Sequence, residues 1–149
     1  MNNIDLKNLG LELKQDIKNL EYNGVSIEIK QYLPISEKLD LISWIVNNSQ
    51  EIGINYINWP RVNLFIALGL VKYYTNITIE EEEEFKIIFD LLINTKLYHQ
   101  IIELIPADEV AIIEEQSRTM IKEIKDYQNS ILGILEAISN DYSNLSYDV

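Results

Sequence analysis

The sequence predicts a mainly α-helical chain: a single domain over residues 1–149, with five or six helices, a small N-terminal β-hairpin and a long C-terminal helix. Three observations support this. Apolar residues recur at three- and four-residue steps through much of the chain. An Asn-Gly pair follows a short N-terminal segment and precedes an alternating apolar and polar stretch. After Pro106, one apolar series continues to Leu145. A chain of 149 residues has the size of one typical domain.

The first twenty residues carry leucine and isoleucine at helical spacing. Steps of three and four residues place these side chains on one face of an amphipathic helix. We therefore expect a helix at the N-terminus, with a buried face formed by Leu6, Leu9, Leu13, Ile17 and Leu20.

A β-hairpin is predicted over residues 19–30. Asn23 and Gly24 suit the two central positions of a type I′ turn, which both require positive φ. The following residues 25–30 alternate between apolar and polar, as in a half-buried strand. The incoming strand is expected to be short, at residues 19–22.

Two helices are expected in the middle of the chain. Ser36 is placed to cap a helix that continues to Val46. Pro60 fits the first turn of a second helix. This helix is apolar on nearly all sides over residues 62–73, so we expect it at the centre of the core. Gly69 within it suggests that a neighbouring element packs closely there.

A run of five glutamates precedes the next apolar stretch. Thr78 and Glu81 form a Thr-x-x-Glu capping box, which predicts a helix that begins at Ile79. Most of the run would then lie in the first helical turn, where the helix dipole favours negative charge. Capping explains two or three acids but not five, so the run is a candidate docking surface: Glu80, Glu81, Glu82, Glu83 and Glu84.

The C-terminal residues 107–145 show the most regular pattern in the chain. Apolar residues follow one helical face from Val110 to Leu145, and only Ser117 interrupts them. One straight helix of this length would extend beyond a compact domain and pair with another chain. The alternative is two core helices joined by a bend near Gly133. On the first interpretation, the candidate interaction residues are Ile124, Tyr127, Ile131 and Leu135.

The net charge of −12 is concentrated in the second half of the chain. Residues 1–75 hold eight acids and seven bases, a balance of −1, whereas residues 76–149 hold sixteen acids and five bases, a balance of −11. Such a surface repels nucleic acid, because phosphate contacts require Lys and Arg. It would attract a basic protein, although acidity can also serve solubility alone.

No residue pattern indicates catalysis or cofactor binding. The chain lacks cysteine, and its single histidine, His99, has only Glu103 within one helical turn, which is too small a ligand set for zinc. No glycine-rich phosphate loop or calcium loop is present. We expect a non-enzymatic protein without metal or cofactor, without a membrane-spanning helix and without direct nucleic-acid binding. The absence of cysteine fits a reducing compartment such as the cytoplasm.

Four stretches together resemble small acidic proteins of tailed phages that infect low-GC Gram-positive bacteria. They are "NGVSIEIKQYLPISEKLDLI", "YYTNITI", "LIPADE" and "NSILGILEAISNDYSNL", which span residues 23–145. The layout of a short hairpin carrying "KQYLP" before an acidic helical body is also similar to that of tail assembly chaperones. The resemblance implies a gene in the structural and assembly region of the phage, with the protein in the host cytoplasm or in the virion. It implies no active site.

Two functional hypotheses follow. In the first, a non-enzymatic phage protein acts by protein–protein interaction in virion assembly or as a particle component, and it binds another structural protein or itself as a homo-oligomer. In the second, an acidic protein inhibits a host defence nuclease, in the manner of an anti-CRISPR protein, by occupying a basic channel. A regulatory module that binds a basic host protein is a third possibility.

Overall fold

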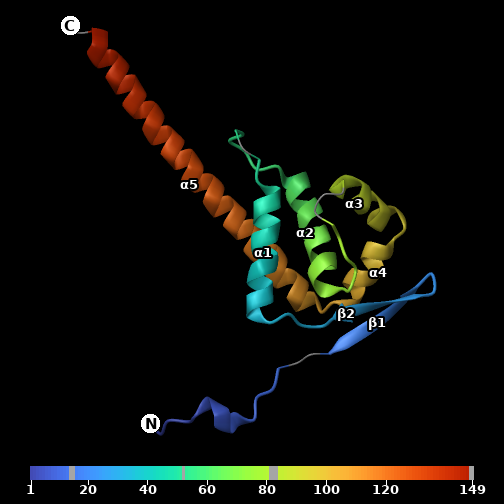
Figure 1. Cartoon of the computed structure of the whole chain (residues 1–149). Helices are drawn as coiled ribbons and strands as arrows, with labels where there is room; N and C mark the ends of the chain where they lie inside the picture. Colours follow the sequence, from blue (N-terminus) through green and yellow to red (C-terminus); the bar gives the residue numbers. More distant parts are fainter. Residues whose placement is uncertain (14–15, 52, 81–83, 148–149) are drawn as a thin grey trace.

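The structure is a computed structural model that describes residues 1–13, 16–51, 53–80 and 84–147, with side chains as far as Tyr142 (Figure 1). It is mainly helical, with a two-stranded antiparallel hairpin near the N-terminus and a long C-terminal helix, as the sequence predicts. The described residues form a short 3₁₀ helix (Leu6–Leu9), β1 (Ile17–Tyr22), β2 (Val25–Lys30), α1 (Ile35–Ser49), α2 (Trp59–Tyr74), α3 (Phe85–Asn94), α4 (Leu97–Leu104) and α5 (Ala107–Tyr147).

The expected N-terminal helix is wrong. Among the described residues 1–13 and 16–22, the helical part is a 3₁₀ turn at Leu6–Leu9, which Asp5 caps by accepting a hydrogen bond from the Lys7 N–H at 3.0 Å. Gly10, at a φ of 64°, ends this turn in the left-handed conformation. Ile17 and Leu20 belong instead to β1, which pairs with β2 along its whole length. Pairing between strands therefore overrides the helical spacing of these residues.

The hairpin forms at the predicted turn. Asn23 and Gly24 both have positive φ, and β1 pairs with β2 in the register that joins Tyr22 to Val25. One face of β2 is buried through Ile27 and Ile29. The hairpin lies across the lower end of the helical body (Figure 1).

The α1 and α2 helices form the centre of the core. Nine residues of α2 are buried, which confirms its predicted central position, and Asn58 caps it with Pro60 in the first turn. Gly69 lies against α1: a Cβ atom there would be 2.8 Å from Cδ1 of Leu41. The expected cap of α1 is wrong, because Pro34 is its N-cap residue and Ser36 makes no capping hydrogen bond; the helix runs to Ser49.

The helix expected to begin at Ile79 starts six residues later, at Phe85. The chain just before Ile79 lies beside β2, where the extended Thr75 bridges to Ile29 and the Asn76 side chain accepts a hydrogen bond from the Glu28 N–H at 3.0 Å. The side chain of Ile79 is buried in the core. β-Branched residues favour this extended conformation, so the capping-box prediction fails.

The last helix, α5, is unbroken. It comprises 41 residues, which corresponds to a length of about 60 Å. The helix continues through Gly133 without a break (Figure 1), so the alternative of two joined core helices is wrong. The first half of α5 packs against α1 and α2, and the second half projects away from the body (Figure 1).

Candidate interaction surface

The start of α5 is fixed to the body by a buried cluster around Glu109. Its carboxylate forms an ion pair with Lys38 of α1, with 2.6 Å between Nζ and Oε2. It also accepts a hydrogen bond from the Leu33 N–H at 3.2 Å. Burial and the adjacent Glu109 charge raise the pKa of Tyr74 well above its ordinary value, so its phenol stays protonated and can donate to Glu109. This cluster connects α5 to α1, α2 and the segment that follows β2.

One face of α5 then follows the core. Val110 and Ile124 are half-buried against it, and between them Ile113, Ser117 and Ile121 are buried. These residues are separated by steps of three or four, so they lie on one side of the helix. The hydroxyl of Ser117 has no hydrogen-bond partner in this environment. The face is thus an ordinary core-facing helix surface with one unsatisfied polar atom.

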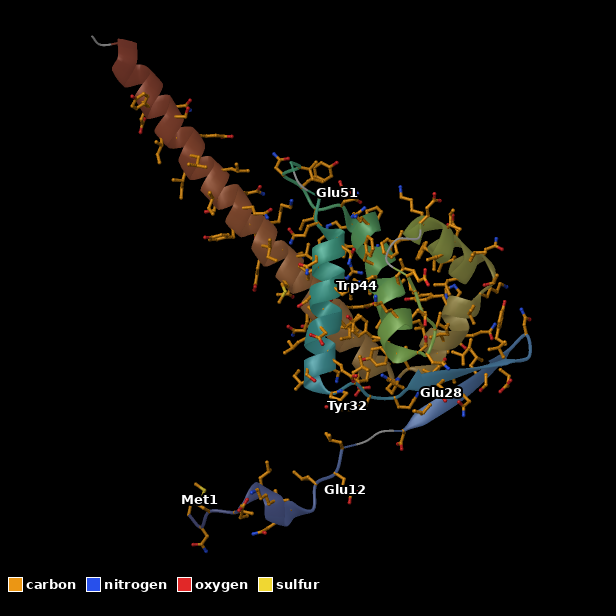
Figure 2. The ribbon with its side chains drawn as sticks, viewed as in Figure 1. Met1, Glu12, Glu28, Tyr32, Trp44 and Glu51 are labelled. Atoms are coloured by element: carbon orange, nitrogen blue, oxygen red, sulfur yellow. The ribbon has the colours of Figure 1, made fainter. Side chains whose placement is uncertain are left out.

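The body's last contacts with α5 come from the loop before α2. The Lys125 ammonium donates to the Ile54 carbonyl at 2.9 Å, and the Asn129 amide donates to the Asn55 carbonyl at 3.2 Å. The labelled Glu51 marks this loop beside α5 in Figure 2. Polar contacts therefore mark the point where the helix leaves the body.

Beyond this point the apolar face of α5 continues uncovered. Every residue from Asp126 to Tyr142 is exposed, and Figure 2 shows the side chains of this half pointing into open space. Six large apolar residues, 40–76% exposed, form a band along one side of this half. Five of them continue the apolar series of the first half at steps of three or four residues, and Ile134 lies next to Leu135 at the edge of the band. We call them the distal stripe: Tyr127, Ile131, Ile134, Leu135, Ile138 and Tyr142.

The distal stripe is unusual because it is contiguous. Scattered exposed apolar residues are normal on a protein surface, but contiguous ones mark interaction sites. Leu132, which is 51% exposed, widens the band on one side. Residues 127–147 contain only two charged side chains, Glu136 and Asp141, whereas residues 107–126 contain nine. The projecting part of α5 is therefore both apolar and nearly uncharged.

The structure separates the predicted interaction residues into two groups. Tyr127, Ile131 and Leu135 lie together on the uncovered face. Ile124 is half-buried against the core and lies just before the uncovered face begins. Ile138 and Tyr142 belong to the predicted apolar series but not to the predicted interaction residues, and Ile134 and Leu132 belong to neither. The sequence "ILGIL" carries their signal, because four large apolar residues around one glycine form a band broader than a single helical stripe.

The glutamate run does not form the first turn of α3. Glu80 is exposed in the segment that precedes α3. Glu84 is the N-cap residue of α3 and makes no capping hydrogen bond with its side chain. The first turn of α3 contains no acid. Glu81, Glu82 and Glu83 lie outside the described residues, so the docking role of the run stays a prediction.

The described residues contain no group of three or more His, Cys, Asp or Glu side chains that could hold a metal ion. His99 and Glu103 are both exposed on α4. In the same part of the chain, no helix is long and apolar enough to cross a membrane. The Glu109 cluster was missed at the sequence level because Lys38 is far from Glu109 in the chain and nothing local connects them.

The chain was also compared with known proteins. No protein-family model matches it, and no curated protein or solved structure matches it either.

Proposed function

We propose that this is a non-enzymatic phage protein that acts by protein–protein contact in virion assembly or as a component of the particle. The observation that carries the proposal is the uncovered apolar half of α5. A folded body with one projecting helix is suited to hold a partner at a distance from its own core. The resemblance in sequence to small acidic phage proteins supplies the biological setting of the proposal.

The apolar surface of the distal stripe sets the scale of the contact it can make. Complete burial of one large apolar side chain contributes roughly 1.5–3 kcal/mol. The six residues of the stripe are 40–76% exposed, so covering them contributes on the order of 5–10 kcal/mol. This is similar to the free-energy cost of association, about 4–15 kcal/mol. We therefore expect binding that depends on protein concentration or on additional contacts from the partner.

The proposal is tested by affinity purification from phage-infected cells, with the tagged chain as bait. The wild-type chain is expected to retain a particle protein or another copy of itself. Ile138→Glu is expected to reduce this retention, because it places a charge in the stripe. Asn140→Glu is the matched control, since it adds the same charge at an exposed position on another side of the same helical turn.

The outcomes discriminate between the two functional hypotheses. Retention of a particle protein that persists as salt is raised supports apolar contact through α5. Retention of a nuclease that is lost as salt is raised, and that Ile138→Glu leaves unchanged, would replace the proposal with the acidic inhibitor. Equal retention by all three chains would place the contact away from α5 and contradict the proposal.

A further inference from the structure

The residue types of the distal stripe follow the same order from either end. Starting from the midpoint between Ile134 and Leu135, the stripe residues met in either direction are first an aliphatic residue, then isoleucine, then tyrosine. Each type lies at the same distance from the midpoint in both directions. The matched positions are 134 and 135, 131 and 138, and 127 and 142. A two-fold axis pairs a surface with itself and makes residue i meet residue j while j meets i. A stripe with this order is complementary to its own antiparallel copy.

We propose that the distal half of α5 pairs with the same segment of a second copy, antiparallel, about a two-fold axis between Ile134 and Leu135. This inference rests on the proposed function and names its first partner. Ile131 then packs against the partner's Ile138, and Tyr127 packs against the partner's Tyr142. The paired region, residues 127–142, is about 24 Å long.

The paired region lies within the part of α5 that the body leaves uncovered. Ile124 is half-buried by the core, and Tyr127 is the first exposed member of the stripe, at 69%. A hollow of about 510 Å³ lies between the loop and α5. Gly53, Ile54 and Asn55 line it from the loop, and Gln128, Ile131 and Leu132 line it from the helix. Antiparallel pairing places residues 137–141 of the second copy at this level. The partner's residues 143–147 then continue past the hollow, beside residues 122–126, where the loop meets α5.

Charge favours a second copy in the antiparallel orientation. Two copies of a chain with a net charge of −12 repel each other. Residues 127–147 carry only two acids, so this segment adds little to the repulsion. Antiparallel pairing places Asp141 beside the partner's Gln128. It also holds the two bodies at opposite ends of the paired region, beyond the screening length of roughly 8–10 Å.

A parallel pair would lose these advantages. The seven-residue repeat of Ile124, Ile131 and Ile138 would align in such a pair. The second repeat, Tyr127, Ile134 and Asp141, would then place two Asp141 carboxylates against each other. The two acidic bodies would also lie side by side at one end.

The first experiment measures oligomeric state by sedimentation equilibrium over a range of protein concentrations. The wild-type chain is expected to form a dimer, and so is the control Asn140→Glu. Ile138→Glu is expected to raise the dissociation constant at least about 100-fold, because each dimer would bury two unpaired charges. Thermal melts check that the body stays folded in both variants, since residues 138 and 140 are exposed.

The second experiment tests orientation by charge complementation. Ile131→Lys is expected to be as defective as Ile138→Glu. A mixture of the two chains is expected to form a heterodimer, because antiparallel pairing joins position 138 of one chain to position 131 of the other. In a parallel pair each position meets itself, so mixing would restore nothing.

The third experiment measures distance directly. The chain has no cysteine, so Gln116→Cys, at an exposed position, gives one site for a spin label. Position 116 lies about 18 residues from the proposed axis, so two labels are expected about 55 Å apart. A parallel pair would place them within about 30 Å.

A monomer at all concentrations, a dimer that Ile138→Glu leaves intact, or two labels within about 30 Å would each overturn the inference. These failures are distinguishable from failure of the proposed function. A monomeric chain that retains a particle protein through α5 leaves the proposed function standing. A dimer that retains no particle protein supports the pairing and contradicts a role in assembly.

Discussion

The two halves of α5 have the same helical periodicity and different surroundings. In residues 107–125 the apolar face is covered by α1 and α2, and Glu109 is paired inside the body. In residues 126–142 the same face continues without cover. An apolar helical face therefore does not by itself reveal what covers it. The proximal half contributes stability to the fold, and the distal half offers a surface to a second molecule.

The largest expected effect separates the buried acid of α5 from the exposed one. Glu109→Ala would leave the Lys38 ammonium buried without its partner, so we expect a loss of about 3–5 kcal/mol in the free energy of unfolding. Glu136→Ala, at an exposed position of the distal half, is expected to change it by less than about 0.5 kcal/mol. Urea denaturation followed by circular dichroism measures both.

A double variant sharpens this prediction. Lys38→Met combined with Glu109→Leu removes both charges, so it is expected to lose far less stability than Glu109→Ala alone. Equal losses in the single and double variants would mean that the ion pair is not the reason for the effect.

The second prediction compares two isoleucines on the same face. Ile113 is fully buried, so Ile113→Ala is expected to reduce the free energy of unfolding by about 2–5 kcal/mol. Ile138 is 59% exposed, so Ile138→Ala is expected to change it by less than about 0.5 kcal/mol at concentrations where the chain is monomeric. Similar losses at both positions would show that the distal stripe is covered within one chain.

The third prediction compares two helical glycines. Gly69→Ala would bring a Cβ atom to 2.8 Å from Leu41 Cδ1 and 3.0 Å from Ile45 Cγ1. We expect it to destabilise the fold by about 1–3 kcal/mol despite the helix propensity of alanine. Gly133→Ala meets no atom within 4 Å and is expected to stabilise α5 by up to about 1 kcal/mol. Thermal melts and the helical circular dichroism signal distinguish the two outcomes.

The smallest expected effect concerns two serines. Ser117 is fully buried and its hydroxyl has no partner, so Ser117→Ala is expected to raise the free energy of unfolding by about 1 kcal/mol. Ser130→Ala, in the exposed half, changes helix propensity equally but removes no buried hydroxyl. The difference between the two variants in urea denaturation isolates the burial effect. A loss of stability in Ser117→Ala would indicate that the hydroxyl is hydrogen-bonded.

Features that depend on local geometry are predicted correctly from the amino-acid sequence. Asn23 and Gly24 specify the hairpin turn because both need positive φ. The period of the apolar residues after Pro106 specifies a long helix and the side on which its apolar residues gather. Pro60 and Gly69 were also interpreted correctly, since the first turn of a helix and a close contact each require those residue types.

Features that depend on distant partners follow from the packing of the folded chain and not from local patterns. Leu6, Leu9, Ile17 and Leu20 have helical spacing, but β2 recruits the last two into a strand. The capping box at Thr78 is outcompeted by the pairing of Asn76 with Glu28 and by the burial of Ile79. The sequence predicted part of the distal stripe, Tyr127, Ile131 and Leu135, but the packing of the body determines where cover ends, between Ile124 and Tyr127. A periodic pattern specifies a helical face, and only its neighbours in space determine whether that face belongs to the core or to a partner.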